Sequence, residues 1–271
     1  MTRGSRNASR APLIAILTDF GYEDWFGGVL RGIIKGLCPA ADIIDITHGI
    51  APQDVTGGAL ALASACGYFP DHTIFLAVVD PGVGTLRQPV IVRAGRRFFV
   101  GPNNGLFGLV ARPLPQIRCR VIEPRRVSAV APSATFHGRD IFAPAAAMLA
   151  AGKPWTRLAP VPAEVVPLSL PRPQVGPDSV TGAIIHFDRF GNAITSIEPV
   201  HASQLPPPVA VRLPRRRCMP LRTTYAEVPP GQPLAYWGSA GFLEIGVNCG
   251  SARERLRLER GTPVTLAHEG A

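Results

Sequence analysis

Long apolar runs and paired cysteines are absent from this sequence. Apolar runs such as Ala59 to Cys66 and Ile74 to Val79 fall far short of the roughly 18–20 residues that span a bilayer. The five cysteines are widely spaced and never form a C-x-x-C pair, which argues against a disulfide framework and a thiolate zinc site. Residues 1–12 are basic and polar, without an apolar stretch. We therefore expect a disordered tail at 1–12 on a soluble, cytoplasmic protein that does not bind membranes.

Lysine is also scarce, although the chain is strongly basic. Only Lys35 and Lys153 are lysines among the 28 basic residues, and the formal net charge is +9 with an isoelectric point near 10.0. The arginines are scattered, and no zinc-finger spacing, RNP-like strand or basic heptad helix accompanies them. We interpret the charge as a solvated basic surface and expect no nucleic-acid partner. A nucleic-acid-associated protein is the alternative, and a salt-dependent mobility shift would reveal it.

The first half of the chain alternates short β-branched runs with segments of helical period. A hydrophobic content of 46% excludes a disordered chain. We expect strands at 13–17, 43–46 and 73–79, helices at 25–37, 54–68 and 140–151, and a hairpin formed by 90–94 and 98–101. This alternation predicts a Rossmann-like α/β domain with a largely parallel, doubly wound sheet.

The second half of the chain is different in composition. Prolines recur between 154 and 177 without a sustained helical period, as is typical of an interdomain connection. Beyond it, short strand candidates are separated by Gly, Pro and Asn, at 180–187, 193–197, 209–213, 234–237, 242–247 and 264–267. We therefore predict an N-terminal α/β domain at 13–172 and a smaller all-β domain, a barrel or a sandwich, at 173–271.

Three strands end in a carboxylate that enters a turn: Asp19, Asp45 and Asp80. The carboxyl ends of parallel strands share one edge of a sheet, so we expect the three acids to converge on one crevice. The alternative is that each aspartate caps the next helix or turn. The loop from Asp80 to Thr85 is too short for a dinucleotide fingerprint. A carboxylate such as Asp19 can hold a ribose diol. We therefore predict that the ligand is a nucleoside without a polyphosphate rather than a dinucleotide.

Two further segments suggest function. His137 lies in a turn before a helix, where the helix dipole would favour the neutral ring, although it could equally hydrogen-bond the helix start. Gly191 and Asn192 lie between two strand candidates and are foremost a hairpin turn. The other histidines lack ligand spacing, so we predict no metal site.

Five motifs occur in this order along the chain: Leu17-Thr18-Asp19-Phe20-Gly21, Val79-Asp80-Pro81-Gly82-Val83-Gly84-Thr85, Gly101-Pro102-Asn103-Asn104-Gly105-Leu106, Phe136-His137-Gly138-Arg139-Asp140-Ile141-Phe142 and Asp188-Arg189-Phe190-Gly191-Asn192. Together they resemble the S-adenosyl-L-methionine (SAM) hydroxide adenosyltransferases, adenosine-forming SAM hydrolases related to the fluorinating and chlorinating SAM enzymes. The resemblance implies an N-terminal α/β domain, a C-terminal β-barrel and a homotrimer with active sites at subunit interfaces. It also implies that SAM is the substrate and that no cofactor is required.

Carried over by position, the resemblance implies a catalytic trio of Asp80, Arg87 and His137. It implies that Asp19 holds the ribose hydroxyls. It also implies further substrate contacts from Phe136, Asp188, Phe190, Asn192, Tyr225, Ser239 and Asn248. Halide-using relatives have an uncharged residue in place of Asp80 and a serine in place of Gly138. Gln53 stands where relatives often have an aromatic residue.

These expectations define a reaction. Water would attack C5′ of SAM and release adenosine and L-methionine, with Asp80 and His137 holding and deprotonating the water while Arg87 orients Asp80. An anionic Asp80 would repel a halide. Halide adenosyltransfer and non-catalytic binding of SAM or adenosine are the alternatives, which an adenosine assay with and without halide would separate.

Overall fold

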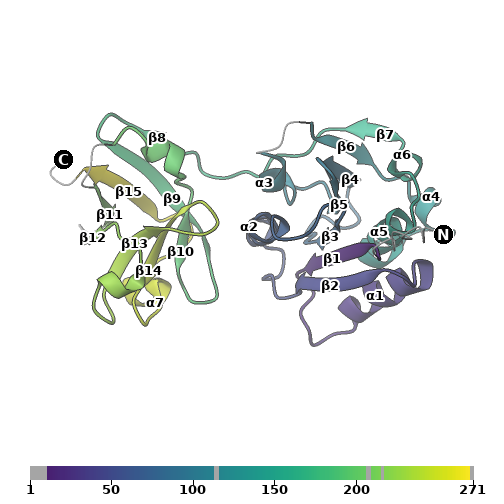
Figure 1. Ribbon diagram of the computed structural model, residues 1–271, viewed down its shortest axis with the longest axis horizontal. Coiled ribbons are helices and arrows are strands. Elements are labelled where there is room, and N and C mark those ends of the chain that lie inside the picture. The colour runs from purple at the N-terminus through teal and green to yellow at the C-terminus, as the bar shows by residue number, and fades with distance from the viewer. Residues whose placement is uncertain (1–10, 113–115, 206–208, 215–216, 269–271) are drawn as a thin grey trace, which may run out of the picture. The chain divides into compact units, whose positions relative to one another are not determined.

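The computed structural model describes residues 11–112, 116–205, 209–214 and 217–268 (Figure 1). Residues 1–10 of the predicted tail lie outside the described residues, whereas the Pro12 carbonyl accepts a hydrogen bond from the Asp42 N–H at 2.9 Å. The chain divides into two compact units, Met1–Leu168 and Ser169–Ala271. Among the described residues, no helix is long and apolar enough to cross a membrane.

The first unit contains a seven-stranded sheet in the order β2-β1-β3-β5-β4-β6-β7. Its strands are β1 (Leu13–Thr18), β2 (Asp42–Thr47), β3 (Ile74–Val78), β4 (Pro89–Ala94), β5 (Arg97–Pro102), β6 (Arg118–Val121) and β7 (Val161–Ala163). Strands β2, β1, β3 and β5 are parallel, while β4, β6 and β7 run antiparallel to their neighbours. The sheet is therefore mixed, and the predicted α/β class is confirmed.

The helices of this unit are α1 (Phe26–Leu37), α2 (Val55–Cys66), α3 (Gly108–Ala111), α4 (Pro124–Val127), α5 (Ala143–Ala150) and α6 (Trp155–Leu158). A π-helical turn, η1 (Gly138–Phe142), leads directly into α5, so the helix predicted at 140–151 begins with a wider turn. Strands β1 and β3 are buried almost throughout, because helices cover them. Ile14 and Ile16 face the core that α1 and α5 share, since alternate residues of a strand face one side.

The proline-rich segment differs from its predicted role as a connection. It contributes α6 and β7 to the first unit, and β7 pairs with β6 at the edge of the sheet. Pro162 lacks a backbone N–H, and an edge strand tolerates this because one of its sides is unpaired.

The second unit is an eight-stranded sheet of β8 (Gln174–Val175), β9 (Ser179–Phe187), β10 (Ala193–Thr195), β11 (Val209–Leu213), β12 (Arg217–Pro220), β13 (Pro233–Trp237), β14 (Leu243–Val247) and β15 (Pro263–His268). The order β12-β11-β15-β9-β10-β14-β13 is antiparallel, and β8 pairs with β9. A bridge between Leu221 and Ala235 links the two ends of this path, so the sheet is nearly closed. The predicted β-barrel is confirmed. Short helices η2 (Pro199–Ala202), η4 (Tyr225–Glu227) and α7 (Ala252–Leu256) also belong to this unit.

Candidate functional site

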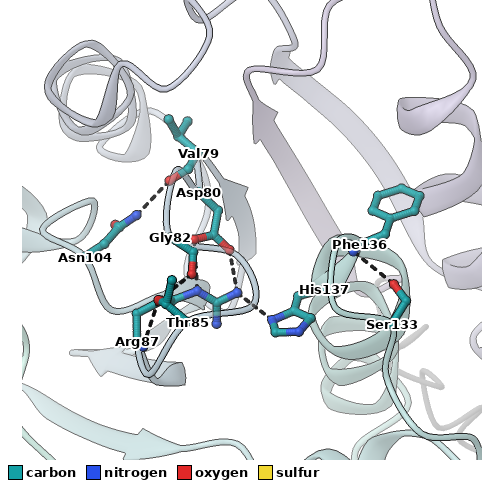
Figure 2. Close-up of polar contacts among 9 residues, drawn as sticks. All are labelled: Val79, Asp80, Gly82, Thr85, Arg87, Asn104, Ser133, Phe136 and His137. Carbon is teal, nitrogen blue, oxygen red and sulfur yellow. Dashed lines mark hydrogen bonds and ion pairs between the residues drawn. The ribbon is translucent and has the colours of Figure 1, made fainter.

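Asp80, Arg87 and His137 form one hydrogen-bonded cluster in the first unit (Figure 2). Arg87 Nε donates to Asp80 Oδ1 at 2.9 Å, and Arg87 Nη2 donates to Asp80 Oδ2 at 2.5 Å. The same Nη2 lies 2.6 Å from His137 Nδ1. The three residues predicted as a catalytic trio are therefore brought together, with the guanidinium between the carboxylate and the imidazole.

Turns after β3 and β5 hold Asp80 in place. The Asn104 side chain donates to the Val79 carbonyl at 2.8 Å, and the Thr85 hydroxyl donates to the Gly82 carbonyl at 2.7 Å. Gly84 has φ of +79°, and a Cβ there would lie close against the Ala134 carbonyl oxygen. A residue with a side chain is therefore excluded at Gly84, which allows the loop to fold back to Arg87.

His137 is neutral in this arrangement. A guanidinium can only donate, so Nδ1 of His137 must accept, and the ring proton is on Nε2. Burial and then the Arg87 charge lower the pKa of His137, while Asp80, Asp140 and a hydrogen bond to the Ser133 backbone raise it in part. Burial and the Arg87 charge thus favour the neutral form, the direction predicted from the position of His137 before a helix.

The cluster is well shielded from solvent. The side chains of Arg87 and Asp80 are 9% and 6% exposed. Arg87 Nη1 is buried without a hydrogen-bond partner in the described structure, and the guanidinium carbon lies 5.3 Å from the centre of the Phe142 ring. The ring's negative face compensates the cation in part. An ion pair in such surroundings is screened little by salt.

Asp19 lies near this cluster, as predicted for the neighbouring ends of β1 and β3. The backbone N–H of Gln53 donates to Asp19 Oδ2 at 2.8 Å. Burial raises the pKa of Asp19, and repulsion by Asp80 adds to this effect. Gln53 adopts a left-handed conformation, with φ of 65°. The backbone N–H of Gln53 thus binds the carboxylate of Asp19, the residue predicted to hold the ribose hydroxyls.

Asp45 does not join the other two aspartates in these contacts, so the prediction that all three converge is wrong. Its carboxylate forms an ion pair with Arg31 of α1, and its Oδ1 lies 3.3 Å from His48 Nε2. His48 is 2% exposed, and its Nδ1 lies 2.7 Å from the Thr18 hydroxyl. Thr18 and His48 together support the loop that carries Asp19, because Gly21 N–H also donates to the His48 carbonyl at 2.9 Å. The sequence analysis missed this role of His48, whose partner Thr18 is 30 residues away.

The second unit contains a pocket of about 620 Å³. Its lining includes five of the predicted substrate residues: Asp188, Phe190, Asn192, Tyr225 and Ser239. Tyr236, Trp237 and Glu244 also line it, and the sequence analysis did not identify them as site residues. A pocket of this size with aromatic walls and a few polar groups is typical of small-ligand sites.

The loop between β9 and β10 places the first three of these residues. Asp188 Oδ1 accepts hydrogen bonds from the backbone N–H groups of Phe190 and Asn192, at 2.9 and 2.8 Å, and Oδ2 accepts from the Asn192 side chain at 2.8 Å. Gly191 has φ of +82°, and a Cβ there would overlap the Ser251 side chain. The hairpin predicted from Gly191 and Asn192 is therefore confirmed, and it also shapes the pocket.

Two predicted substrate residues have other contacts. Asn248 donates from its side chain to the Val228 carbonyl at 2.7 Å and supports the neighbouring chain. The Phe136 ring packs edge-on against Phe20 and Phe26, with ring centres 5.9 and 5.2 Å away. Within the described ranges, no cluster of three or more His, Cys, Asp or Glu side chains is arranged to hold a metal ion.

Comparison with known proteins identifies the family. Residues 14–159 match the N-terminal domain of the SAM hydroxide adenosyltransferases, and residues 182–265 match the C-terminal domain. The chain belongs to this family. It is 45% identical, over 93% of its length and 98% of the relative, to a protein of Thermus thermophilus named (R)-S-adenosyl-L-methionine hydrolase.

A more distant relative and a solved structure support this placement. A fluorinase of an Actinoplanes species is 26% identical over 96% of this chain and 98% of the relative. The crystal structure of an uncharacterized conserved protein from Thermotoga maritima is 36% identical and superposes with a TM-score of 0.86, covering 94% of this chain and all of that one.

Proposed function

We propose that this protein hydrolyses SAM by attack of water on C5′, giving adenosine, L-methionine and a proton. The observation that carries the proposal is the buried cluster in which Arg87 binds both Asp80 oxygens and His137 Nδ1. Family membership and the name of the 45% identical relative support the same reaction.

Asp80 is the residue best suited to accept the proton of the attacking water. A carboxylate has about four acceptor positions, and Arg87 uses one on each oxygen, so both oxygens can still accept from water. His137 has Nδ1 engaged by Arg87, and burial together with the Arg87 charge lowers the pKa of its ring. We therefore assign His137 to hold Arg87 and Asp80 in place, with Asp80 as the base.

The substrate supplies much of the driving force. Methionine leaves a sulfonium as a neutral thioether, so the leaving group needs no proton and no metal. The C5′–S bond breaks as the C5′–O bond forms, and the water proton passes to Asp80. The protein must therefore position the water and accept its proton. General-base catalysis of this kind raises the rate by roughly 10²–10⁴.

Chromatography of SAM incubated with the purified protein tests the activity. We expect adenosine and methionine in equal amounts, with no loss after EDTA treatment, because the proposal includes no metal or cofactor. A protein that binds SAM without forming adenosine would instead be a non-catalytic binding protein.

Halide adenosyltransfer is the second candidate, because a fluorinase is among the relatives. The Asp80 carboxylate disfavours it, since it would repel a halide ion. Gly138 adds to this, because a Cβ there would lie 3.2 Å from Phe136 and 3.3 Å from Phe20, which leaves little room for a serine. Chloride or fluoride added to the assay should leave the products unchanged.

We extend the proposal to a homotrimer in the cytoplasm with active sites at subunit interfaces. Sedimentation should give about three times the chain mass of 28.8 kDa. Mixed trimers of an Asp80→Ala chain and an Asp188→Ala chain should recover part of the activity that each variant lacks. Mixed trimers without recovery would place each site within one subunit.

A further inference from the structure

The pocket of the second unit contains a buried carboxylate that the proposed reaction does not use. Glu244 of β14 is 8% exposed and lines the pocket together with Asp188. Among the described lining residues, Lys, Arg and His do not occur. Within a chain of net charge +9, this pocket is therefore locally acidic. Buried carboxylates need hydrogen bonds or a positive partner, because desolvation disfavours the charge.

A chain of two phenols connects Glu244 to the aromatic wall. The Tyr236 hydroxyl donates to Glu244 Oε2 at 2.7 Å, and the Tyr225 hydroxyl lies 2.6 Å from that of Tyr236. An ionised carboxylate can only accept, so Tyr236 must donate to it and in turn accept from Tyr225. Glu244 thus determines the direction of both hydrogen bonds.

The backbone leaves space for this chain at two glycines. Tyr236 and Glu244 are paired across β13 and β14. A Cβ at Gly238 would overlap the Glu244 carboxylate, and a Cβ at Gly246 would lie 2.7 Å from the Tyr225 ring. A side chain at either position would displace a member of the chain, so the two glycines are part of its construction.

The chain continues to the second acid of the pocket. Asn192 lines the pocket beside Tyr225 and lowers the pKa of that phenol in part, and its amide donates to Asp188 Oδ2 at 2.8 Å. Both phenol donors are used within the chain. The two carboxylates therefore offer a ligand acceptors and negative charge on this side of the pocket.

We propose that Glu244 is a positioning residue for substrate binding, which orients Tyr236 and Tyr225 so that the pocket favours a positively charged ligand over a neutral one. This inference rests on the proposed function, because SAM carries the charge that its product adenosine lacks. Such a preference would help the pocket release product.

Protonation of Glu244 would remove this preference for a positively charged ligand. Burial, with repulsion from Asp188, raises the pKa of Glu244, while the hydrogen bond from Tyr236 lowers it. Tyr236 of β13, Tyr225 of η4 and Asp188 of the β9–β10 loop are the titratable groups that face it. As the pH falls through this raised pKa, Glu244 becomes neutral. The affinity of the pocket for a cation should then fall, whereas its affinity for a neutral ligand should change little.

Calorimetry with SAM and adenosine between pH 5 and 8 tests the proposal on the full-length protein, with Asp80→Asn added to each protein used for binding so that SAM is not hydrolysed during the titration. Glu244→Gln should weaken SAM binding by about tenfold, change adenosine affinity by less than about twofold, and flatten the pH dependence of SAM affinity. In turnover, KM should rise with little change in kcat. Glu259→Gln, which alters an exposed carboxylate of the same unit, should behave as wild type.

Tyr236→Phe provides a second variant that keeps the charge and breaks the chain. It should also weaken SAM binding more than adenosine binding. Equal losses for both ligands, or an unchanged pH dependence in Glu244→Gln, would overturn the proposal. If the wild type binds SAM in this way but forms no adenosine, the proposed function fails and this inference stands. If adenosine forms and Glu244→Gln binds SAM normally, this inference alone fails.

Discussion

Removal of the Arg87 guanidinium should affect stability and activity together. In Arg87→Ala, the Asp80 carboxylate loses hydrogen bonds of 2.9 and 2.5 Å, and His137 Nδ1 loses its donor. Asp80 is only 6% exposed, so water cannot replace these partners without rearrangement. Two hydrogen bonds to a buried charge contribute about 3–6 kcal/mol, and breaking a buried ion pair typically costs about 3–5 kcal/mol. We therefore expect Arg87→Ala to lower the free energy of unfolding of the first unit by about 3 kcal/mol or more.

Urea unfolding followed by circular dichroism measures this loss. The double variant Arg87→Ala/Asp80→Ala should be more stable than the sum of the single changes predicts, because it leaves no unpaired buried carboxylate. Arg96→Ala is the matched control, since Arg96 is 67% exposed and lies 3.8 Å from Asp71; it should change stability by less than about 0.5 kcal/mol. A loss below about 1 kcal/mol for Arg87→Ala, or strict additivity in the double variant, would refute the reasoning.

Three further predictions follow from other contacts. Asp19→Ala should weaken adenosine binding in calorimetry, and unchanged affinity would mean that another group holds the ribose. Burial and Arg31 lower the pKa of His48 below its usual 6.5. As the pH falls, His48 therefore takes up a proton in the unfolded chain before it does so in the folded protein, and the free energy of unfolding should fall below about pH 6.5. His48→Gln should reduce this pH dependence in thermal unfolding, and an identical slope would contradict it. Gly191→Ala should destabilise the second unit by more than about 1 kcal/mol and weaken SAM binding, because its φ is positive and Ser251 occupies the space; a wild-type urea midpoint would show that the loop adapts.

Local patterns predicted the strands and turns whose signals lie within a few residues. Strands β1 and β3 were predictable because they are buried on both sides and read as continuous apolar runs. Strand β6 was missed because arginines alternate with apolar residues over only four positions. Strand β7 was missed because Pro162 disfavours a strand unless the strand is at an edge.

Contacts between distant residues were beyond sequence reasoning. Asp45 was predicted to end its strand as Asp19 and Asp80 do, but β2 continues to Thr47, and the Asp45 side chain contacts Arg31 of α1 and His48 instead. Glu244 was missed because its partner Tyr236 lies on the neighbouring strand, where register decides which side chains meet. Asp80 and His137 were candidates from local patterns, but Arg87 and the grouping of the three residues came only through the resemblance, since no local pattern links positions 80, 87 and 137.

Hydrolysis in water enriched in ¹⁸O tests the central claim most directly. If water held at the Asp80 cluster attacks C5′, mass spectrometry should find one ¹⁸O atom in the adenosine and none in the methionine, and Asp80→Asn should slow the appearance of labelled adenosine by roughly 10²–10⁴. Unlabelled adenosine, or labelled adenosine formed at the wild-type rate by Asp80→Asn, would contradict the account.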